Sequence, residues 1–176
     1  MSSPQSARRP GAVVVVQSLL WLWLVFLSVL VALGYQALSD QADQERLDSR
    51  LQRDTILVVS WPLCEVLLMN ESRYPWLILV PRRPGATEIY QLEEIDQMTL
   101  LRESSRLGRA LMTEFAGDKL NVAALGNVVS QLHVHHVVRF AGDAAWPGPV
   151  WGKHVPEPYA ADALDSLLRR LVALLS

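Results

Sequence analysis

The sequence predicts an α+β domain, with an antiparallel sheet and two helices, preceded by one hydrophobic N-terminal helix. Two observations lead to this fold class: an uncharged apolar run near the N-terminus, and a polar remainder in which short β-type segments are followed by a helix, twice in succession. Strands grouped in this way are typical of α+β domains with antiparallel sheets. The predicted division is an N-terminal hydrophobic segment (1–39), a linker (40–53) and a folded domain (54–176).

The N-terminal segment has no charged residue between Arg9 and Asp40. A helix of about 20 apolar residues spans the hydrocarbon layer of a membrane, so residues 12–34 are predicted to be a membrane anchor. Two alternatives stay open. Arg8 and Arg9 with small residues near 32–34 also fit a secretory signal, and the segment also fits a start codon assigned too far upstream.

The folded domain is preceded by polar residues 41–53, which are predicted to form a short helical linker. The following residues are apolar and β-branched, and they are interrupted by proline and by turn-forming residues. These patterns predict strands at 56–59, 64–69 and 76–80, a turn at 70–73 and a loop at 82–85.

A long helix is predicted over Leu92–Phe115 and a second over Ala160–Leu175, because apolar residues recur at helical spacing in both. Strands are predicted between them at Lys119–Leu125 and Gln131–Phe140. The apolar face predicted for the first helix comprises Leu92, Ile95, Met98, Leu101, Gly108, Met112 and Phe115. That of the second comprises Leu164, Leu167, Leu168, Leu171 and Leu175.

Three of the four histidines are crowded into the last predicted strand. Side chains of a strand alternate between its two faces, which places Gln131, His133 and His135 on one face and His136 on the other. An imidazole titrates near neutral pH, so it can attack phosphorus when neutral and donate to phosphate oxygens when protonated. The row is therefore a candidate phosphate site.

A glycine-containing loop precedes this row of histidines. Gly126 would allow the backbone to approach a phosphate closely, and Asn127 and Ser130 offer hydrogen-bond donors. A loop of this kind beside a histidine row is predicted to cradle a phosphate.

The stretch 119–139 resembles the active-site strand of the histidine-triad (HIT) family, whose motif alternates three histidines with apolar residues. The best register puts Gln131 at the first histidine position, His133 at the second and His135 at the third. Residues 67–82 look like the strand–turn–strand that holds the nucleoside, and 145–152 resemble a tryptophan- and proline-rich tail of one bacterial branch. The resemblance extends from about residue 47 to the C-terminus and implies a HIT-like fold.

The resemblance implies a nucleotidyl hydrolase or transferase acting on a nucleotide phosphoramidate or a dinucleoside polyphosphate. His133 would attack the α-phosphate and form a nucleotidyl-histidine. His135 would bind phosphate oxygens, and Gln131 would lie near the leaving group.

For nucleotide binding, Asn70 is similar to the family's ribose-contacting position. Asn121 and Asn127, with Gly126, would hold the phosphate end.

Three departures from the family pattern change this expectation. Glutamine at position 131 puts protonation of the leaving group by that residue in doubt. Trp76 stands where the family has a histidine on the nucleoside-side strand. His136 replaces an apolar residue, and we interpret it as structural.

Other classes of function are weighed against this hypothesis. The net charge of −2 and the lack of a basic cluster give no indication of a nucleic-acid partner. The single cysteine, Cys64, excludes an internal disulfide and is interpreted as a buried apolar residue. A metal site on His133 and His135 would need Cys64 or His154 as further ligands, so no metal and no cofactor is expected.

The alternatives to an enzyme are a HIT-fold module that binds nucleotides without turnover, and a membrane-tethered interaction protein. A homodimer is compatible with the resemblance. The nucleotide chemistry favours a membrane-anchored protein with its domain in the cytoplasm, or a cytoplasmic protein if the N-terminal segment is not made.

Overall fold

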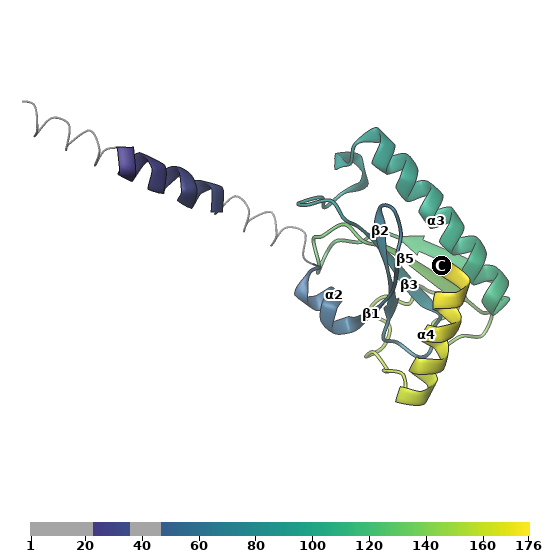
Figure 1. Cartoon of the computed structure of the whole chain (residues 1–176). Coiled ribbons are helices and arrows are strands. Elements are labelled where there is room, and N and C mark those ends of the chain that lie inside the picture. The colour runs from purple at the N-terminus through teal and green to yellow at the C-terminus, as the bar shows by residue number, and fades with distance from the viewer. Residues whose placement is uncertain (1–22, 36–46) are drawn as a thin grey trace, which may run out of the picture. The chain divides into compact units, whose positions relative to one another are not determined.

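The computed structural model describes residues 23–35 and 47–176 (Figure 1). The chain divides into two compact units, Met1–Gln44 and Glu45–Ser176, and each is described by itself.

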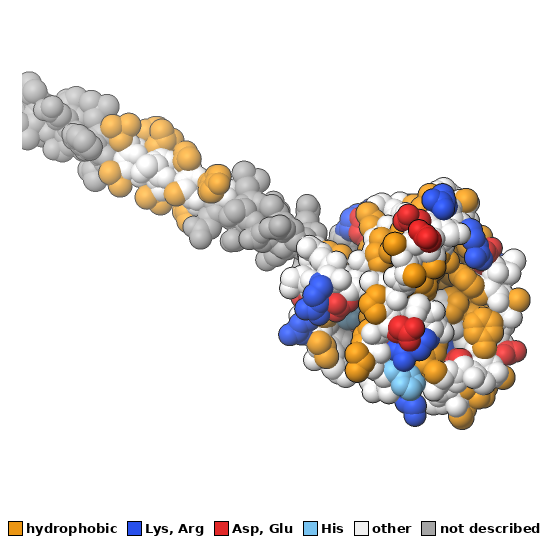
Figure 2. All heavy atoms as spheres, turned by 90° about the horizontal axis from the view of Figure 1, so that it is seen from below, with side chains coloured by type: hydrophobic (Ala, Val, Ile, Leu, Met, Phe, Trp, Pro, Cys, Tyr) orange, Lys and Arg blue, Asp and Glu red, His pale blue; other side chains and the backbone are white. Residues whose placement is uncertain are grey.

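In the first unit, residues 23–35 form a helix whose side chains are exposed, and many of them are hydrophobic (Figure 2). The predicted anchor at 12–34 lies partly outside the described residues, as does the first half of the predicted linker helix at 41–53. Over 23–35 and 47–176, no helix combines the length and the apolar character that a membrane crossing requires.

The second unit is built on a five-stranded antiparallel sheet, which confirms the predicted α+β fold of the domain. Its strands are arranged in the order β1-β2-β3-β5-β4, with every neighbouring pair antiparallel. The strands are β1 (Thr55–Ser60), β2 (Cys64–Met69), β3 (Trp76–Pro81), β4 (Lys119–Ala123) and β5 (Val134–Arg139).

Two strands are shorter in the structure than the sequence predicts. The strand predicted at 119–125 ends at Ala123, and the strand predicted at 131–140 begins only at Val134. The chain between them leaves the sheet as a loop in which Gly126 has a φ of 69°, a left-handed conformation that glycine adopts without strain. Gln131 and His133 therefore belong to the end of this loop.

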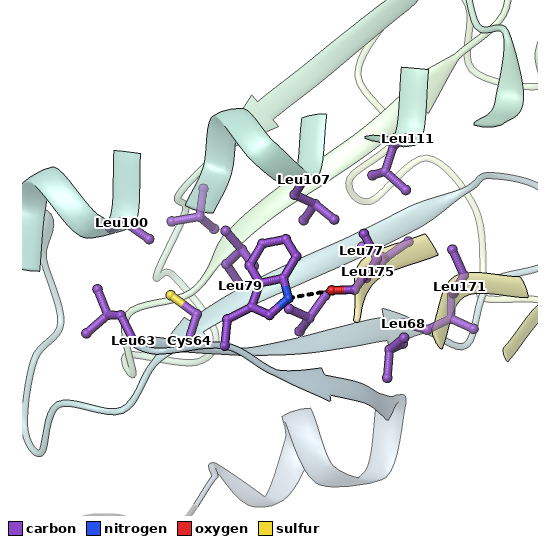
Figure 3. Packing of buried hydrophobic residues seen from close by; sticks show 14 of the residues in the cluster. Leu63, Cys64, Leu68, Leu77, Leu79, Leu100, Leu107, Leu111, Leu171 and Leu175 are labelled. Atoms are coloured by element: carbon purple, nitrogen blue, oxygen red, sulfur yellow. Dashed lines mark hydrogen bonds between the residues drawn. The ribbon is translucent and has the colours of Figure 1, made fainter. Parts of the chain in front are cut away.

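One face of the sheet is covered by two long helices, α3 (Glu94–Phe115) and α4 (Ala161–Leu175). Alternate strand residues, such as Leu77 and Leu79 of β3, pack there against Leu107 and Leu111 of α3 (Figure 3). The indole of Trp61 fixes the end of α4 by donating to the Leu175 carbonyl oxygen at 2.9 Å. The apolar face predicted for α4 is confirmed, because its leucines all belong to this cluster.

The apolar face predicted for α3 is wrong in its first half. Ile95, Met98 and Leu101 are exposed, while Asp96 and Glu103 are buried with Leu100, Leu107 and Leu111. The two acids can be buried because their oxygens have hydrogen-bond partners. Asp96 accepts from Arg83, and Glu103 accepts from the backbone N–H groups of Leu63 and Cys64.

The opposite face is covered by a short helix, α2 (Ser49–Asp54), and by loops. The Asp48 side chain caps α2 by accepting from the Arg50 N–H, and Leu51 is buried against the sheet. The cluster on this face also contains Trp76 and Ile78 from β3 and Val137 from β5. A 3₁₀ turn, η1 (Ile89–Gln91), precedes α3.

Candidate active site

A pocket of about 370 Å³ opens on the face of the sheet that α2 and the loops cover. Its walls come from α2, β1, the end of β2, β3, the loop after β4, the histidine stretch and the tryptophan-containing loop near 151. The lining residues are Arg50, Leu51, Asp54, Thr55, Met69, Trp76, Ile78, Leu125, Gly126, Asn127, Val128, Val129, His133, His135, Trp151 and Gly152. Much of this wall is apolar, which suits the burial of a flat ring system.

His133 stands at the end of the loop and lines the pocket. Its Nδ1 lies 2.7 Å from the carbonyl oxygen of Gln131. A carbonyl only accepts hydrogen bonds, so Nδ1 carries the proton and Nε2 of the neutral ring keeps its lone pair. The local turn thus fixes the tautomer in which Nε2 is the nucleophilic nitrogen.

His135 lies beside it on β5, with the two ring centroids 4.8 Å apart and the rings nearly perpendicular. The Trp76 indole N–H donates to Nδ1 of His135 at 3.0 Å. Because an indole can only donate, Nδ1 is unprotonated and the proton of the neutral ring is on Nε2. The two imidazoles therefore have opposite tautomers.

Burial, together with smaller effects of the neighbouring His133 and His136, lowers the pKa of His135 to about 3. His135 is therefore neutral at physiological pH, and it can act as a hydrogen-bond donor through Nε2.

His136 points to the helix face, as the strand alternation predicts. It is fully buried, and both ring nitrogens are occupied: Nδ1 lies 3.1 Å from the Val134 carbonyl oxygen, and Nε2 lies 2.8 Å from the Ser104 hydroxyl on α3. Burial lowers its pKa to about 4, although the hydrogen bond to Val134 opposes this shift. His136 thus links β5 to α3 and does not reach the pocket.

Gln131 differs from its two histidine neighbours in what its side chain contacts. Its Oε1 accepts from the backbone N–H of Asp48 at 2.8 Å. This bond attaches the N-terminal end of α2 to the stretch that carries His133. The structure therefore places the Gln131 amide against α2, whereas His133 and His135 line the pocket together.

The predicted phosphate loop reaches the pocket through Gly126 and Asn127. A side chain from α2 also contacts this loop: Nη1 of Arg50 donates to the Val128 carbonyl oxygen at 2.5 Å. A cation is thereby held against the loop that was predicted to bind phosphate.

Asn70 and Asn121 have other contacts and do not line the pocket. The side-chain oxygen of Asn70 accepts from the Tyr159 N–H at 3.0 Å. The side-chain oxygen of Asn121 accepts from Nη1 of Arg139 at 2.7 Å. Both amides thus fix parts of the fold beside the pocket.

Arg139 is the centre of a buried ion pair at the end of β5. It binds both carboxylate oxygens of Asp143, at 2.7 and 2.8 Å, and its guanidinium lies over the rings of Tyr74 and Trp146. The hydrogen bond from Arg139 lowers the pKa of Asp143 to about 2. This network holds the loop that continues to Trp151 in the pocket wall.

Several pocket residues were not predicted from the sequence. Arg50 and Leu51 come from the segment interpreted as a linker, Asp54 is the first residue of the predicted domain, and Trp151 was only assigned to a family-like tail. The sequence does predict a helix here, and Asp48 is an N-cap type residue directly before α2. Nothing in the local sequence indicates that this helix lies over the histidines.

The residues of the alternative metal site are not brought together. Cys64 is buried in the cluster beneath the helices, and the exposed His154 lies 3.3 Å from the Ala144 carbonyl oxygen. Within residues 23–35 and 47–176, no group of three or more His, Cys, Asp or Glu side chains is arranged to hold a metal ion.

Comparisons with known proteins agree with this fold. The family model for the HIT domain matches residues 50–142. A histidine triad protein of Marinobacter aquaeolei is 52% identical, with a TM-score of 0.74 over 75% of this chain and 96% of that protein. A histidine triad protein of Bradyrhizobium japonicum is 47% identical, with a TM-score of 0.73 over 76% of this chain and 99% of that protein. A third, from Sinorhizobium meliloti, is 41% identical, with a TM-score of 0.73 over 76% and 98%. A search of the curated proteins gave no match.

Proposed function

We propose, from the premise that this chain belongs to the HIT domain family, that it is a nucleotidyl hydrolase or transferase with His133 as its nucleophile. Members of this family are commonly nucleotide hydrolases or transferases. The observation that carries the proposal is the tautomer of His133: Nδ1–H is bound to the Gln131 carbonyl oxygen at 2.7 Å, and Nε2 keeps its lone pair on a ring that lines the pocket.

The proposed reaction has two steps. In the first, a bond forms between Nε2 of His133 and the α-phosphorus of the substrate, and the bond from phosphorus to the leaving group breaks, with the electron pair departing on the leaving atom. In the second, a water oxygen bonds to phosphorus, the nitrogen–phosphorus bond breaks, and the water proton is released. A nucleoside monophosphate leaves, and His133 returns to its neutral form.

His135 and the glycine loop are suited to stabilise the charge that develops on the phosphoryl oxygens. Nε2–H of His135 is a donor beside the nucleophile, because its Nδ1 is occupied by the Trp76 indole. Donors fixed in advance lower the barrier without reorganisation during the reaction. Trp76, Ile78 and Met69 supply the apolar wall against which a base would pack.

The test is release of AMP by the full chain from adenosine 5′-phosphoramidate and from diadenosine tetraphosphate. His133→Ala is expected to abolish release of AMP from both, with an unchanged circular dichroism spectrum. His154→Ala, at an exposed histidine, is the matched control and should keep wild-type rates. Turnover by His133→Ala at the wild-type rate would contradict the proposal.

A second candidate function is nucleotide binding without turnover. It is favoured by Gln131, whose amide cannot protonate a leaving group and whose Oε1 is already bound to the Asp48 N–H. This candidate predicts micromolar binding of nucleotides and no covalent adduct. Trapping of a nucleotidyl group on His133, detected by mass spectrometry, would exclude it.

For the N-terminal segment, the proposal is the one made from the sequence: residues 12–34 anchor the protein in a membrane, with the domain in the cytoplasm. The full chain is then expected to sediment with membranes after cell lysis and to be released by detergent. Recovery of the full chain in the supernatant without detergent would contradict it.

A further inference from the structure

Arg50 occupies a defined position in the pocket wall. Its guanidinium is fixed at the loop 125–128 by the bond from Nη1 to the Val128 carbonyl oxygen, at 2.5 Å. The helix that carries it is fixed in turn, because Gln131 accepts from the Asp48 N–H and Asp48 caps that helix. The same residue, Gln131, accepts from His133 through its main-chain oxygen. Arg50 and the proposed nucleophile are therefore held by one set of hydrogen bonds and line one pocket.

The other charged group of this pocket is Asp54, on the next turn of α2. Both of its carboxylate oxygens are bound by Arg53, at 2.7 and 2.8 Å. Asp54 precedes Thr55, which pairs with Met69, so this acid lies where β1 begins and β2 ends. Arg50 lies instead at the glycine loop, where the phosphate groups of a nucleotide are expected.

Among the residues that the structure describes, those beside His133 provide no acid for a leaving group. Gln131 has an amide side chain, which does not ionise. Nδ1 of His135 accepts from Trp76, so the only proton on this ring is that of a neutral imidazole, on Nε2. An amine leaving group has to take up a proton as its bond to phosphorus breaks, whereas a phosphate or nucleoside polyphosphate departs as a stable anion.

We propose that Arg50 makes this site selective for nucleoside phosphoanhydrides, whose leaving group departs as a phosphate-type anion, over nucleotide phosphoramidates. This inference rests on the proposed function and narrows its substrate class. With diadenosine tetraphosphate, Nε2 of His133 bonds to the α-phosphorus and the bond to the bridging oxygen breaks. ATP then departs with the electron pair on that oxygen. The Arg50 guanidinium offsets this negative charge through charge-assisted hydrogen bonds, which are stronger than neutral ones.

The test compares kcat/KM for AMP release from diadenosine tetraphosphate and from adenosine 5′-phosphoramidate, in the full chain and in Arg50→Gln. Both substrates transfer the same adenylyl group, so the ratio of the two constants reports on the leaving group. Glutamine keeps a donor for the Val128 carbonyl and removes the charge. The ratio of kcat/KM for diadenosine tetraphosphate to that for adenosine 5′-phosphoramidate is expected to fall about tenfold in Arg50→Gln. It should stay at the wild-type value in Arg102→Gln, which removes an equal charge from the exposed surface of α3, outside the pocket lining.

The outcomes distinguish stabilisation of the leaving-group anion by the Arg50 charge from positioning of the loop by the Arg50 hydrogen bond. An equal loss of kcat/KM on both substrates would assign Arg50 to positioning of the loop and overturn the inference. Values of kcat/KM that stay at the wild-type level for both substrates would overturn it as well. Neither result would affect the role of His133.

A binding measurement keeps the inference testable if the wild type releases no AMP, a result that would contradict the proposed function. ADP carries one phosphate more than AMP, and the wild type is expected to bind ADP about tenfold more tightly. Arg50→Gln should remove this preference and Arg102→Gln should keep it. Equal affinities in the wild type, a preference that survives in Arg50→Gln, or no binding of either nucleotide would overturn the inference.

Discussion

The two faces of the sheet are formed by the same strands, but they are built from different side chains. The helix face is a closed cluster rich in leucine, in which Leu107 and Leu111 of α3 have no exposed surface. The pocket face combines aromatic rings and imidazoles with apolar residues, and it is open over about 370 Å³. β5 contributes to both through two consecutive histidines.

His135 and His136 show what the difference between the faces means chemically. Both are buried and both have a lowered pKa because burial disfavours the charged ring. His136 has partners on both nitrogens, so it can only hold β5 to α3. His135 has a partner on Nδ1, and its ring lines the pocket. The same side chain is structural on the closed face and available to a ligand on the open one.

The largest expected effect comes from opening a cavity on the closed face. Leu107→Ala should lower the free energy of unfolding by about 2–5 kcal/mol, because the surrounding helix and sheet cannot collapse into the space. Val129→Ala, which removes an apolar group from the pocket wall, should cost about 1–2 kcal/mol. Urea unfolding measured by circular dichroism checks both. Equal losses would mean that the pocket face is packed as tightly as the helix face.

The effects of these two substitutions on activity are expected in the reverse order. Per folded molecule, Leu107→Ala is expected to keep the rate of AMP release, since the side chain lies beneath α3. Val129→Ala is expected to raise KM, because it reshapes the wall of the pocket. A raised KM in Leu107→Ala with no change in Val129→Ala would contradict the division of roles between the faces.

The closed face is also where the sequence was hardest to interpret in detail. Its strands follow from β-branched and apolar runs between turn residues, and α4 follows from leucines at helical spacing. For α3, however, the true buried positions include Asp96 and Glu103, whose partners are Arg83 and two backbone N–H groups. Local periodicity contains no information about such partners, so the exposed Ile95, Met98 and Leu101 gave a more regular pattern than the buried residues.

On the pocket face, the sequence predicted the histidine pair and the glycine loop. These residues are close in the chain, so their spacing and the turn composition were enough to bring them together, although His133 lies at the end of the loop and only His135 lies in β5. It did not predict that Arg50 contacts Val128, or that Trp76 donates to His135. Those contacts join residues far apart in the chain and depend on the tertiary arrangement of α2, β3 and β5.

A second prediction concerns the dependence of stability on pH. His136 has a pKa of about 4 in the folded protein and about 6.5 when unfolded. Between these values the unfolded state binds more protons, so stability is fully present above pH 6.5 and is lost as the pH falls toward 4. The loss is up to about 1.4 kcal/mol per pH unit for this histidine. The pKa of His135, about 3, adds a loss of the same sign over the same interval.

His136→Leu separates the two contributions. At pH 7 it should cost about 1 kcal/mol, because the hydrogen bond with Ser104 is lost. Its stability should then decline less steeply than that of the wild type, so the two curves approach each other between pH 6.5 and 4. Melting temperatures measured at half-unit intervals of pH check this. Parallel curves would mean that His136 does not remain neutral in the folded protein.

The smallest expected effect tests how the pocket face holds His135 in one tautomer. Trp76→Phe keeps an aromatic ring but removes the N–H that donates to Nδ1 at 3.0 Å. Either ring nitrogen can then carry the proton, so only part of the population presents Nε2–H to the pocket. We expect kcat for AMP release to fall roughly two- to tenfold, with a change in the ¹⁵N shifts of the His135 ring.

Trp151→Phe is the matched control for this change. Trp151 lies edge-on to Trp76 and His135, at 5.8 and 5.6 Å between centroids. Its buried indole N–H has no hydrogen-bond partner among the described residues. Removing that N–H takes away no described bond and relieves an unsatisfied donor, so kcat should stay near wild type and stability should rise slightly. Equal losses of kcat in the two variants would assign the effect to aromatic packing around His135. A loss confined to Trp76→Phe would assign it to the indole hydrogen bond and the tautomer that this bond selects.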